Sequence, residues 1–409
     1  MSTWIRNPEG RIIAIEKERL DQHPLKKRPG KTSGGIILVA ALLIAIGLIL
    51  VWPSNDPAAL PVSTQTGVED RLVSGVAGQV GDEEYLFALT ADGAELLRPS
   101  LAVFTLDDSG RLQRTTSLSA PVDELRDDLP AAPGIAFADS TAYVPLAGTD
   151  RSALWIVDLS DPEAPRELAT VELETEPGSV AVSGNLVAVG PMDGAIVRFF
   201  DTSDLAQPQA LGDYRNRIVS PTALAFVNDT LFVTNRDGVT AVDVSLVEAP
   251  REVGSWSNEN WWRGIPMRLH EVTPNATLAG NHLYAAADVW GVEVLDIGNP
   301  EDITRPTRSL SVTQLPQSGA NIDDAVDVAA TGDTLYALWR GDATDEAPVR
   351  WVYTIQQIDV SDPGDPQVVS ETNDLVGYSA LQSLVVGESH LYFLNRDWIH
   401  VVNTAGETP

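Results

Sequence analysis

The chain has 409 residues, with 58 aspartates and glutamates against 27 lysines and arginines and a formal net charge of −31. Such an excess of negative charge repels nucleic acid and anionic lipid headgroups, so no nucleic-acid partner is expected. The chain contains no cysteine, which excludes disulfides, thiolate nucleophiles and cysteine-based metal sites. The fold must therefore be held by core packing and sheet closure.

Residues 1–35 form a predicted cytoplasmic tail that ends in a basic cluster, and no lysine follows Lys31. Residues 36–52 (IILVAALLIAIGLILVW) carry no charge, and their number is near the lower limit for a helix that crosses a hydrocarbon core of about 30 Å. Because the positive charges precede this run, the N-terminus is expected in the cytoplasm and the rest of the chain outside. We therefore predict a single-pass protein of the cell membrane, anchored by an uncleaved signal anchor. The alternative is a cleaved signal peptide, for which 35 preceding residues are unusual.

Residues 53–59 form a predicted proline-rich linker, and residues 60–409 a predicted ectodomain built from repeats. The clearest copy is Leu154–Pro162 (LWIVDLSDP), an apolar run that ends in an aspartate and opens a turn. Similar runs recur at intervals of roughly 40–60 residues. The polar residues that end them are Asp107, Asp158, Asp201, Asp243, Asp296, Asp359 and Asn403.

Each repeat contains further strand and turn patterns around this mark. Upstream lie two apolar runs joined by a tight turn, and Gly184-Asn185, Gly280-Asn281, Gly332-Asp333 and Gly387-Glu388 have the glycine-first pattern of a type II′ hairpin. Downstream, a proline precedes another short strand. Four antiparallel strands at this period are typical of a propeller blade, because a lone sheet cannot bury both of its faces. The sequence thus predicts an all-β fold, a seven-bladed β-propeller ectodomain behind a single N-terminal transmembrane helix.

Two structural predictions follow from these patterns. The interior of the strands implies that Trp155, Val157, Val242, Val294 and Ile358 are buried between adjacent blades. Only six residues follow Asn403, so the last blade lacks an outer strand and would expose a sheet edge. The missing strand is expected within residues 60–66 (LPVSTQT), so the chain would enter the propeller on the face that bears the aspartate turns, called here the turn face.

The copies LWIVDLSDPEAP and IQQIDVSDPGDP resemble the LVIVD-repeat family of bacterial and archaeal cell-surface proteins. The resemblance extends over roughly residues 70–403 and is weakest in the first and last units. It implies a β-propeller at the cell surface and no reaction common to the family. No catalytic residue is therefore implied by it.

The long connections between repeats hold the candidate site residues, because loops usually meet a propeller's ligands. Trp and Arg are the residue types that dominate binding energy at interfaces, and Trp is a flat platform for a sugar or a cation. Clustered carboxylates can bind a hard cation such as Ca²⁺, although a plain solvated loop is the favoured interpretation of these acidic connections. The predicted recognition face comprises Trp256, Trp261, Trp262, Arg263, Arg268, His270, Asp127, Asp128, Asp323 and Asp324.

The sequence shows no nucleophile motif, no phosphate-binding loop and no metal-ligand spacing. We therefore expect a membrane-anchored extracytoplasmic module, without a catalytic cofactor, that binds or scaffolds an envelope protein, a glycan or a membrane assembly. One alternative is a lactonase-like hydrolase with a metal in the central channel, which the mostly apolar inner strands disfavour. Another is a protein that attaches to a surface layer through a cation.

Overall fold

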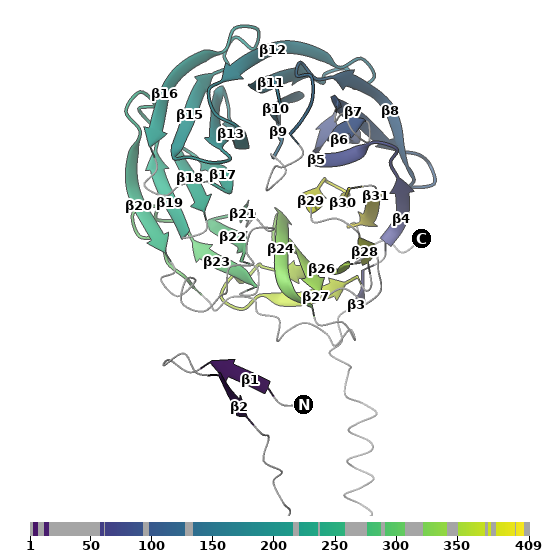
Figure 1. Cartoon of the computed structure of the whole chain (residues 1–409), viewed down its shortest axis with the longest axis vertical. Coiled ribbons are helices and arrows are strands. Elements are labelled where there is room, and N and C mark those ends of the chain that lie inside the picture. Colours follow the sequence, from purple (N-terminus) through teal and green to yellow (C-terminus); the bar gives the residue numbers. More distant parts are fainter. Residues whose placement is uncertain are drawn as a thin grey trace, which may run out of the picture. The chain divides into compact units, whose positions relative to one another are not determined.

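The computed structural model in Figure 1 divides the chain into two units, Met1–Asn55 and Asp56–Pro409. The described residues are 3–6, 12–15, 58–60, 62–92, 98–126, 134–215, 221–235, 238–257, 276–287, 291–306, 322–341, 351–372, 375–377, 382–396 and 398–404. The first unit contains an antiparallel hairpin of β1 (Thr3–Arg6) and β2 (Ile12–Ile15). The predicted span, residues 36–52, lies outside the described residues. Within the described ranges, no helix has the length and apolarity that a bilayer crossing requires.

The described part of the second unit forms seven sheets around a common centre, the blades of an all-β propeller (Figure 1). Blade 1 consists of β5 (Arg71–Val80), β6 (Glu83–Asp92), β7 (Arg98–Leu106) and β8 (Leu112–Ser119). Blade 2 consists of β9 (Ala136–Ala138), β10 (Thr141–Ala147), β11 (Ser152–Asp158) and β12 (Arg166–Leu173). Blade 3 consists of β13 (Pro177–Ser183), β14 (Leu186–Pro191), β15 (Ile196–Asp201) and β16 (Gln209–Arg215).

Blade 4 consists of β17 (Ala223–Val227), β18 (Thr230–Asn235), β19 (Gly238–Asp243) and β20 (Arg251–Ser257). Blade 5 consists of β21 (Ala276–Ala279), β22 (His282–Ala286) and β23 (Val292–Asp296). Blade 6 consists of β24 (Ile322–Thr331), β25 (Thr334–Gly341), β26 (Trp351–Asp359), β27 (Gln367–Glu371), β28 (Leu375–Gly377) and β3 (Ala58–Ala59). Blade 7 consists of β29 (Gln382–Val386), β30 (His390–Asn395), β31 (Trp398–Asn403) and β4 (Val62–Gly67). The prediction of seven blades built on four antiparallel strands is confirmed. Within the described residues blade 5 has three of these strands, and in blade 6 β28 and β3 pair in addition to the four.

The hydrophobic core is divided among the junctions between neighbouring blades. Each of the seven clusters of buried side chains combines residues of two adjacent blades, including one cluster that joins blade 7 to blade 1. The five predicted core residues, Trp155, Val157, Val242, Val294 and Ile358, are each 0% exposed. Because every blade buries both faces against its neighbours, the stability of each sheet depends on a closed ring.

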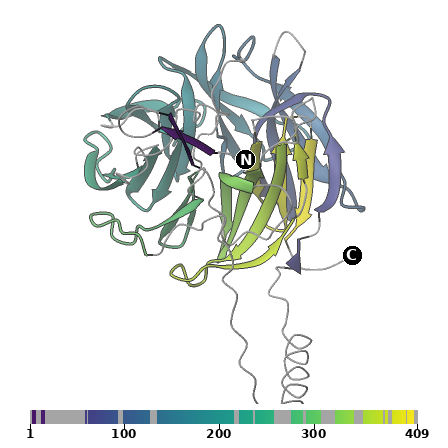
Figure 2. The same cartoon turned by 60° about the horizontal axis from the view of Figure 1, so that its bottom comes forward.

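The ring is closed by the strand that the sequence predicts. β4 lies beside β31 as the outer strand of blade 7 (Figures 1 and 2). The two strands pair antiparallel, with Val62 opposite Val402. A register shift separates Val401 from Val402 in this pair, and the same shift occurs between the third and fourth strands of other blades, for example between Ile156 and Val157. β4 therefore reproduces the geometry of an ordinary outer strand although it precedes blade 1 in the chain. Residues 58–59, expected in the linker, form β3 and pair with β27 of blade 6.

The turns after the marks share one pattern of hydrogen bonds. The carboxylate of Asp158 accepts a bond of 2.8 Å from the backbone N–H of Ser160, two residues on. The N–H of Leu159 donates to the carbonyl of Ser140 in the inner hairpin of the same blade. Corresponding bonds occur after Asp201, Asp243, Asp296 and Asp359. This pattern places the inner hairpins and the aspartate turns together on the turn face; the connections between blades lie on the opposite face, called here the connection face.

The first blade departs from the predicted register by two residues. Its register shift lies between Val103 and Phe104, so Thr105 occupies the place that Asp158 has in blade 2. The expected mark, Asp107, lies beyond it, because the strands of blade 1 extend two residues further on the turn face. Asp107 ends this extension by accepting bonds from the backbone of Ser109 and Arg111. The hydroxyl of Ser109, with the backbone bonds, lowers the pKa of Asp107 to about 2.

The inner hairpins turn through a residue with positive φ, as the glycine-first pattern predicts. Gly184, Gly280 and Gly332 have φ values of 55°, 55° and 54°, and Asn228 has 51° in the same place. Gly387 differs, because Val386 pairs with Leu391 and the turn is wider than two residues. A Cβ atom at Gly387 would lie 2.4 Å from the carboxylate of Glu84. Glycine is needed at position 387 for this close approach between blades. The two-residue hairpin predicted at Gly387-Glu388 is wrong, because the strand pairing ends at Val386 and Leu391.

Candidate functional site

The predicted recognition residues belong to the connection face, and the structure describes only part of them. Trp256 is the second-last residue of strand β20 and Asp324 lies near the start of β24, both next to connections between blades. Asp323 is described as part of the backbone of β24. Asp127, Asp128, Trp261, Trp262, Arg263, Arg268 and His270 lie outside the described residues.

Trp256 is a half-buried residue of the junction between blades 4 and 5. Its side chain packs against the cluster that contains Val239 of blade 4 and Leu283 of blade 5. Trp256 also pairs with Val239 across the two outer strands of blade 4. In the described structure, the Trp256 side chain is therefore part of the hydrophobic packing between blades 4 and 5.

Asp324 takes part in an ion pair at the connection-face end of blade 6. The Nη2 atom of Arg340 lies 2.9 Å from the Asp324 carboxylate, and the arginine side chain is 9% exposed. The guanidinium also stacks over the indole of Trp351, with 4.7 Å between its central carbon and the ring centroid. Because Arg340 neutralises this carboxylate and Trp351 covers the cation, the group as a whole is polar but carries no net charge.

Blade 7 adds residues at the same junction that the predicted face does not contain. Trp398 begins β31 opposite Gly67, and 38% of its surface is exposed. Asn395 and His400 are buried, at 2% and 5% exposure, and each lies two residues from a member of the cluster between blades 6 and 7 (Phe393 and Val402), so both face that junction. The sequence pattern that marks them is a polar residue inside an otherwise apolar strand, as in WIHVVN.

The inner strands that surround the centre are mostly apolar. In blade 4, β17 reads ALAFV, and in blade 7, β29 reads QSLVV. Across the described ranges, no group of three or more His, Cys, Asp or Glu side chains is arranged to hold a metal ion. A buried carboxylate of an inner strand, Asp327, accepts hydrogen bonds from the backbone of Val328 and, across the blade junction, of Leu384. Asp327 therefore joins blade 6 to blade 7.

Polar contacts concentrate where blade 7 meets blade 1. The Glu84 carboxylate accepts hydrogen bonds from the N–H of Ser389 (2.9 Å) and the hydroxyl of Tyr392 (2.7 Å), and it lies 3.1 Å from Nδ1 of His390. Burial by itself raises the pKa of Glu84, but these hydrogen bonds outweigh it and hold the pKa below its ordinary value of 4.5. Glu84 lies in the two-residue extension of blade 1, so this extension provides a contact that closes the ring.

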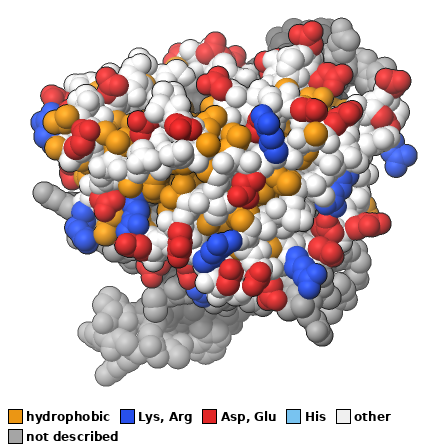
Figure 3. All heavy atoms as spheres, turned by 90° about the horizontal axis from the view of Figure 1, so that it is seen from above, with side chains coloured by type: hydrophobic (Ala, Val, Ile, Leu, Met, Phe, Trp, Pro, Cys, Tyr) orange, Lys and Arg blue, Asp and Glu red, His pale blue; other side chains and the backbone are white. Residues whose placement is uncertain are grey.

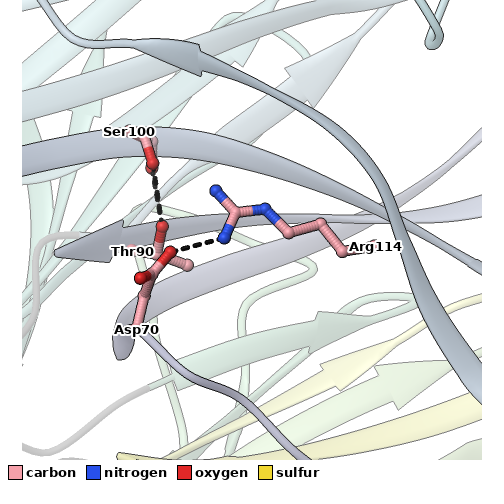
Figure 4. A network of polar contacts seen from close by, with 4 residues as sticks. All are labelled: Asp70, Thr90, Ser100 and Arg114. Atoms are coloured by element: carbon pink, nitrogen blue, oxygen red, sulfur yellow. Dashed lines mark hydrogen bonds and ion pairs between the residues drawn. The ribbon is translucent and has the colours of Figure 1, made fainter. Parts of the chain in front are cut away.

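The connection from blade 7 into blade 1 is fixed on its outer side as well. Arg114 of β8 forms an ion pair with Asp70, which directly precedes β5 (Figure 4). In the same view, the hydroxyl groups of Thr90 and Ser100 lie 3.0 Å apart on neighbouring strands of blade 1. The Arg114–Asp70 ion pair fixes the segment that enters blade 1 from the closing strand, whereas the Thr90–Ser100 contact links two neighbouring strands within blade 1.

The surface of the propeller mixes charges of both signs. On the face in Figure 3, acidic side chains are spread among arginines, with apolar side chains in a band between them. The charge therefore gives no single anionic or cationic patch on this face that would select a partner.

Comparison with solved structures identifies the fold. The WD40 domain of Pan2 from Neurospora crassa superposes with a TM-score of 0.52 at 11% identity, over 86% of this chain and 99% of that chain. The WD40 β-propeller domain of Doa1 gives 0.52 at 8% identity, over 84% and 97%. Virginiamycin B lyase from Staphylococcus aureus gives 0.50 at 11% identity, over 83% and 98%. No family model and no curated protein matches the chain. The chain is a β-propeller, and likeness at this identity establishes the fold alone.

Proposed function

We propose that this protein is a single-pass membrane protein whose propeller binds or scaffolds a protein or glycan partner outside the membrane. The observation that carries the proposal is the closing strand β4, which begins at Val62 shortly after the apolar run 36–52. If residues 36–52 are anchored in a bilayer, the chain that follows them holds the propeller through the strands β3 and β4. The repeats LWIVDLSDP and IQQIDVSDP support placing the protein with the LVIVD-repeat family of the cell surface.

The same strand supports a proposed orientation for the propeller relative to the bilayer. β4 starts beside Val402, at the turn face, and residues 53–57 span at most about 18 Å when fully extended. The turn face is therefore directed towards the bilayer, and the connection face, with Trp398 and the ion pair of Arg340, is directed away from it. Partners are met on the connection face, where Trp and Arg supply the residue types that dominate interface energies.

Cysteine labelling on intact cells tests the topology, because the native chain has no cysteine. Thr149 and Ala164 are exposed residues of blade 2, near its connection-face and turn-face ends respectively. We expect a membrane-impermeant maleimide to label Thr149→Cys on intact cells and Ala164→Cys more slowly. Ser2→Cys, in the predicted cytoplasmic tail, should react only after lysis. Labelling of Ser2→Cys but of neither propeller variant would place the propeller inside and refute the proposal.

A cysteine-directed photocrosslinker at the same two positions tests the binding role. We expect a discrete adduct from Thr149→Cys and none from Ala164→Cys, because the partner meets the connection face. Ala164→Cys is the matched control, since both positions lie in blade 2 and both are exposed. An adduct from Ala164→Cys alone would reverse the assignment of the faces.

A further inference from the structure

Three buried polar side chains at the junction of blades 6 and 7 retain hydrogen-bonding atoms without a protein partner among the described residues. These atoms are Nε of Arg340, Nδ2 of Asn395 and Nε2 of His400. The residues are 7%, 2% and 5% exposed. A buried polar group without a partner costs stability, so three at one junction call for an explanation.

Side-chain alternation places Arg340 and Asn395 on the same side of the junction. Leu338 and Phe393 belong to the cluster between blades 6 and 7. Arg340 lies two residues after Leu338, and Asn395 lies two residues after Phe393. Because successive side chains of a strand point to opposite faces, residues two apart share a face. Both polar side chains therefore point into the space between the two blades, on its connection-face side.

His400 reaches the same junction from the outer part of blade 7. Val402, two residues on, belongs to the cluster between blades 6 and 7, and the His400 ring stacks on Phe393 with centroids 5.5 Å apart. The ring centroid of Tyr353, from blade 6, lies 5.4 Å from the ring centroid of Phe393. Burial lowers the pKa of His400, so the imidazole is neutral at neutral pH and its Nε2 can either donate or accept.

Two tryptophans flank these polar groups near the connection face. Trp351 of blade 6 lies under the Arg340 guanidinium, and Trp398 of blade 7 lies beside Asn395 in the register. A Cβ atom at Gly67 would lie 3.1 Å from the six-membered ring of Trp398, so the glycine packs closely against that ring. The exposed part of Trp398 offers a flat apolar surface next to the buried donors.

The chemistry of the group selects a neutral ligand that is rich in oxygen. Arg340 and Asn395 supply N–H donors, and the Asp324 carboxylate already balances the charge of Arg340. A strongly acidic chain also disfavours an anion. Polar groups that face one junction beside aromatic rings are a combination found in small-molecule sites. We propose that Arg340, Asn395, His400 and Trp398 form a binding site for a neutral saccharide at the connection-face end of the junction between blades 6 and 7.

This inference rests on the proposed function, because it names the class of glycan that the exposed face would bind. The test is isothermal titration calorimetry of the full-length protein in detergent with maltotriose, chitotriose and mannotriose. We expect at least one of them to bind with a Kd of about 1 mM or tighter. Asn395→Ala and Trp398→Ala should each weaken that binding by roughly tenfold or more, because each removes a contact with the sugar.

Asn235→Ala is the matched control, since Asn235 has the corresponding place in blade 4, is also 2% exposed, and accepts a bond from the N–H of Gly238. It should leave the Kd unchanged. Near-UV circular dichroism checks that each variant is folded, and Trp398→Ala remains informative if Asn395→Ala does not fold. Absence of binding by all three saccharides, or binding that both Asn395→Ala and Trp398→Ala leave unchanged, would overturn the proposal.

Two further outcomes separate the explanations. If Asn395→Leu is more stable than the native protein and no saccharide binds, the buried groups hold only water and the saccharide site is refuted. If the labelling experiment places the propeller outside and no saccharide binds, the site fails while the proposed function stands. If a saccharide binds but the propeller is inside, the proposed function fails and the site stands.

Discussion

The hydroxyl of Tyr392 in blade 7 donates a hydrogen bond of 2.7 Å to the carboxylate of Glu84 in blade 1, across 308 positions of the chain. This bond joins the last blade to the first at the turn face. The same carboxylate accepts from Ser389 and contacts His390. The pKa of Tyr392 is raised, first by burial and then by this carboxylate, so the tyrosine stays a donor throughout the accessible pH range.

Glu84→Gln should destabilise the protein at neutral pH by about 1–3 kcal/mol, because a partly buried charge-assisted contact becomes a neutral one. The folded-state pKa of Glu84 lies below its ordinary value of 4.5. Its ionised form therefore stabilises the fold above that value, and the contribution is lost as the pH falls through the lowered pKa. Urea unfolding should thus show a difference between native protein and variant at pH 7 that shrinks below pH 4.5. Glu163→Gln, at an exposed turn residue, is the control; a difference independent of pH would contradict the assignment.

Truncation before and after the closing strand should give opposite results. A chain that begins at Asp56 keeps β3 and β4, so it should remain monodisperse in size-exclusion chromatography. A chain that begins at Val68 lacks β4, which leaves the edge of β31 open to pairing with other chains. We expect this second chain to aggregate or to form higher oligomers. Monomeric behaviour of both chains would show that the closing strand is dispensable.

Leu246 is 63% exposed in the turn after Asp243. In blade 2 the same turn position holds Asp161, whose carboxylate accepts a bond from the N–H of Glu163. The carbonyl of Leu246 still accepts from Ala249, as the carbonyl of Asp161 does from Ala164, so the turn geometry is retained. Leu246→Asp should therefore stabilise the protein by about 0.5–1.5 kcal/mol. A lower unfolding midpoint in the variant would indicate that Leu246 makes a contact that the isolated chain does not display.

Ile358→Ala tests the packing between blades 5 and 6. Ile358 is 0% exposed and belongs to the cluster that joins these blades. Its truncation should cost on the order of 2–5 kcal/mol in unfolding free energy, through lost burial and the cavity left behind. Val369→Ala, at a position 47% exposed in the same blade, should change stability by less than about 0.5 kcal/mol. Equal effects of the two substitutions would contradict the strand register.

The repeat pattern by itself determined the fold, because its information is local. An apolar run such as Leu154–Val157 and the turn after Asp158 specify strand and reversal within a few residues. The incomplete last repeat likewise predicted a closing strand within residues 60–66, and the structure places it at Val62–Gly67. The first blade resisted this reasoning, since its two added residues per strand move Asp107 away from the place that Thr105 fills.

Only the tertiary structure decided which polar side chains meet between blades. Glu84 and Tyr392 are at opposite ends of the propeller sequence, and Arg340 and Asn395 lie on strands of different blades. Contacts between blades join residues that are distant in the chain, so no spacing in the sequence encodes them. The requirement for glycine at position 387 has the same origin, because the atom that approaches it belongs to Glu84 of another blade.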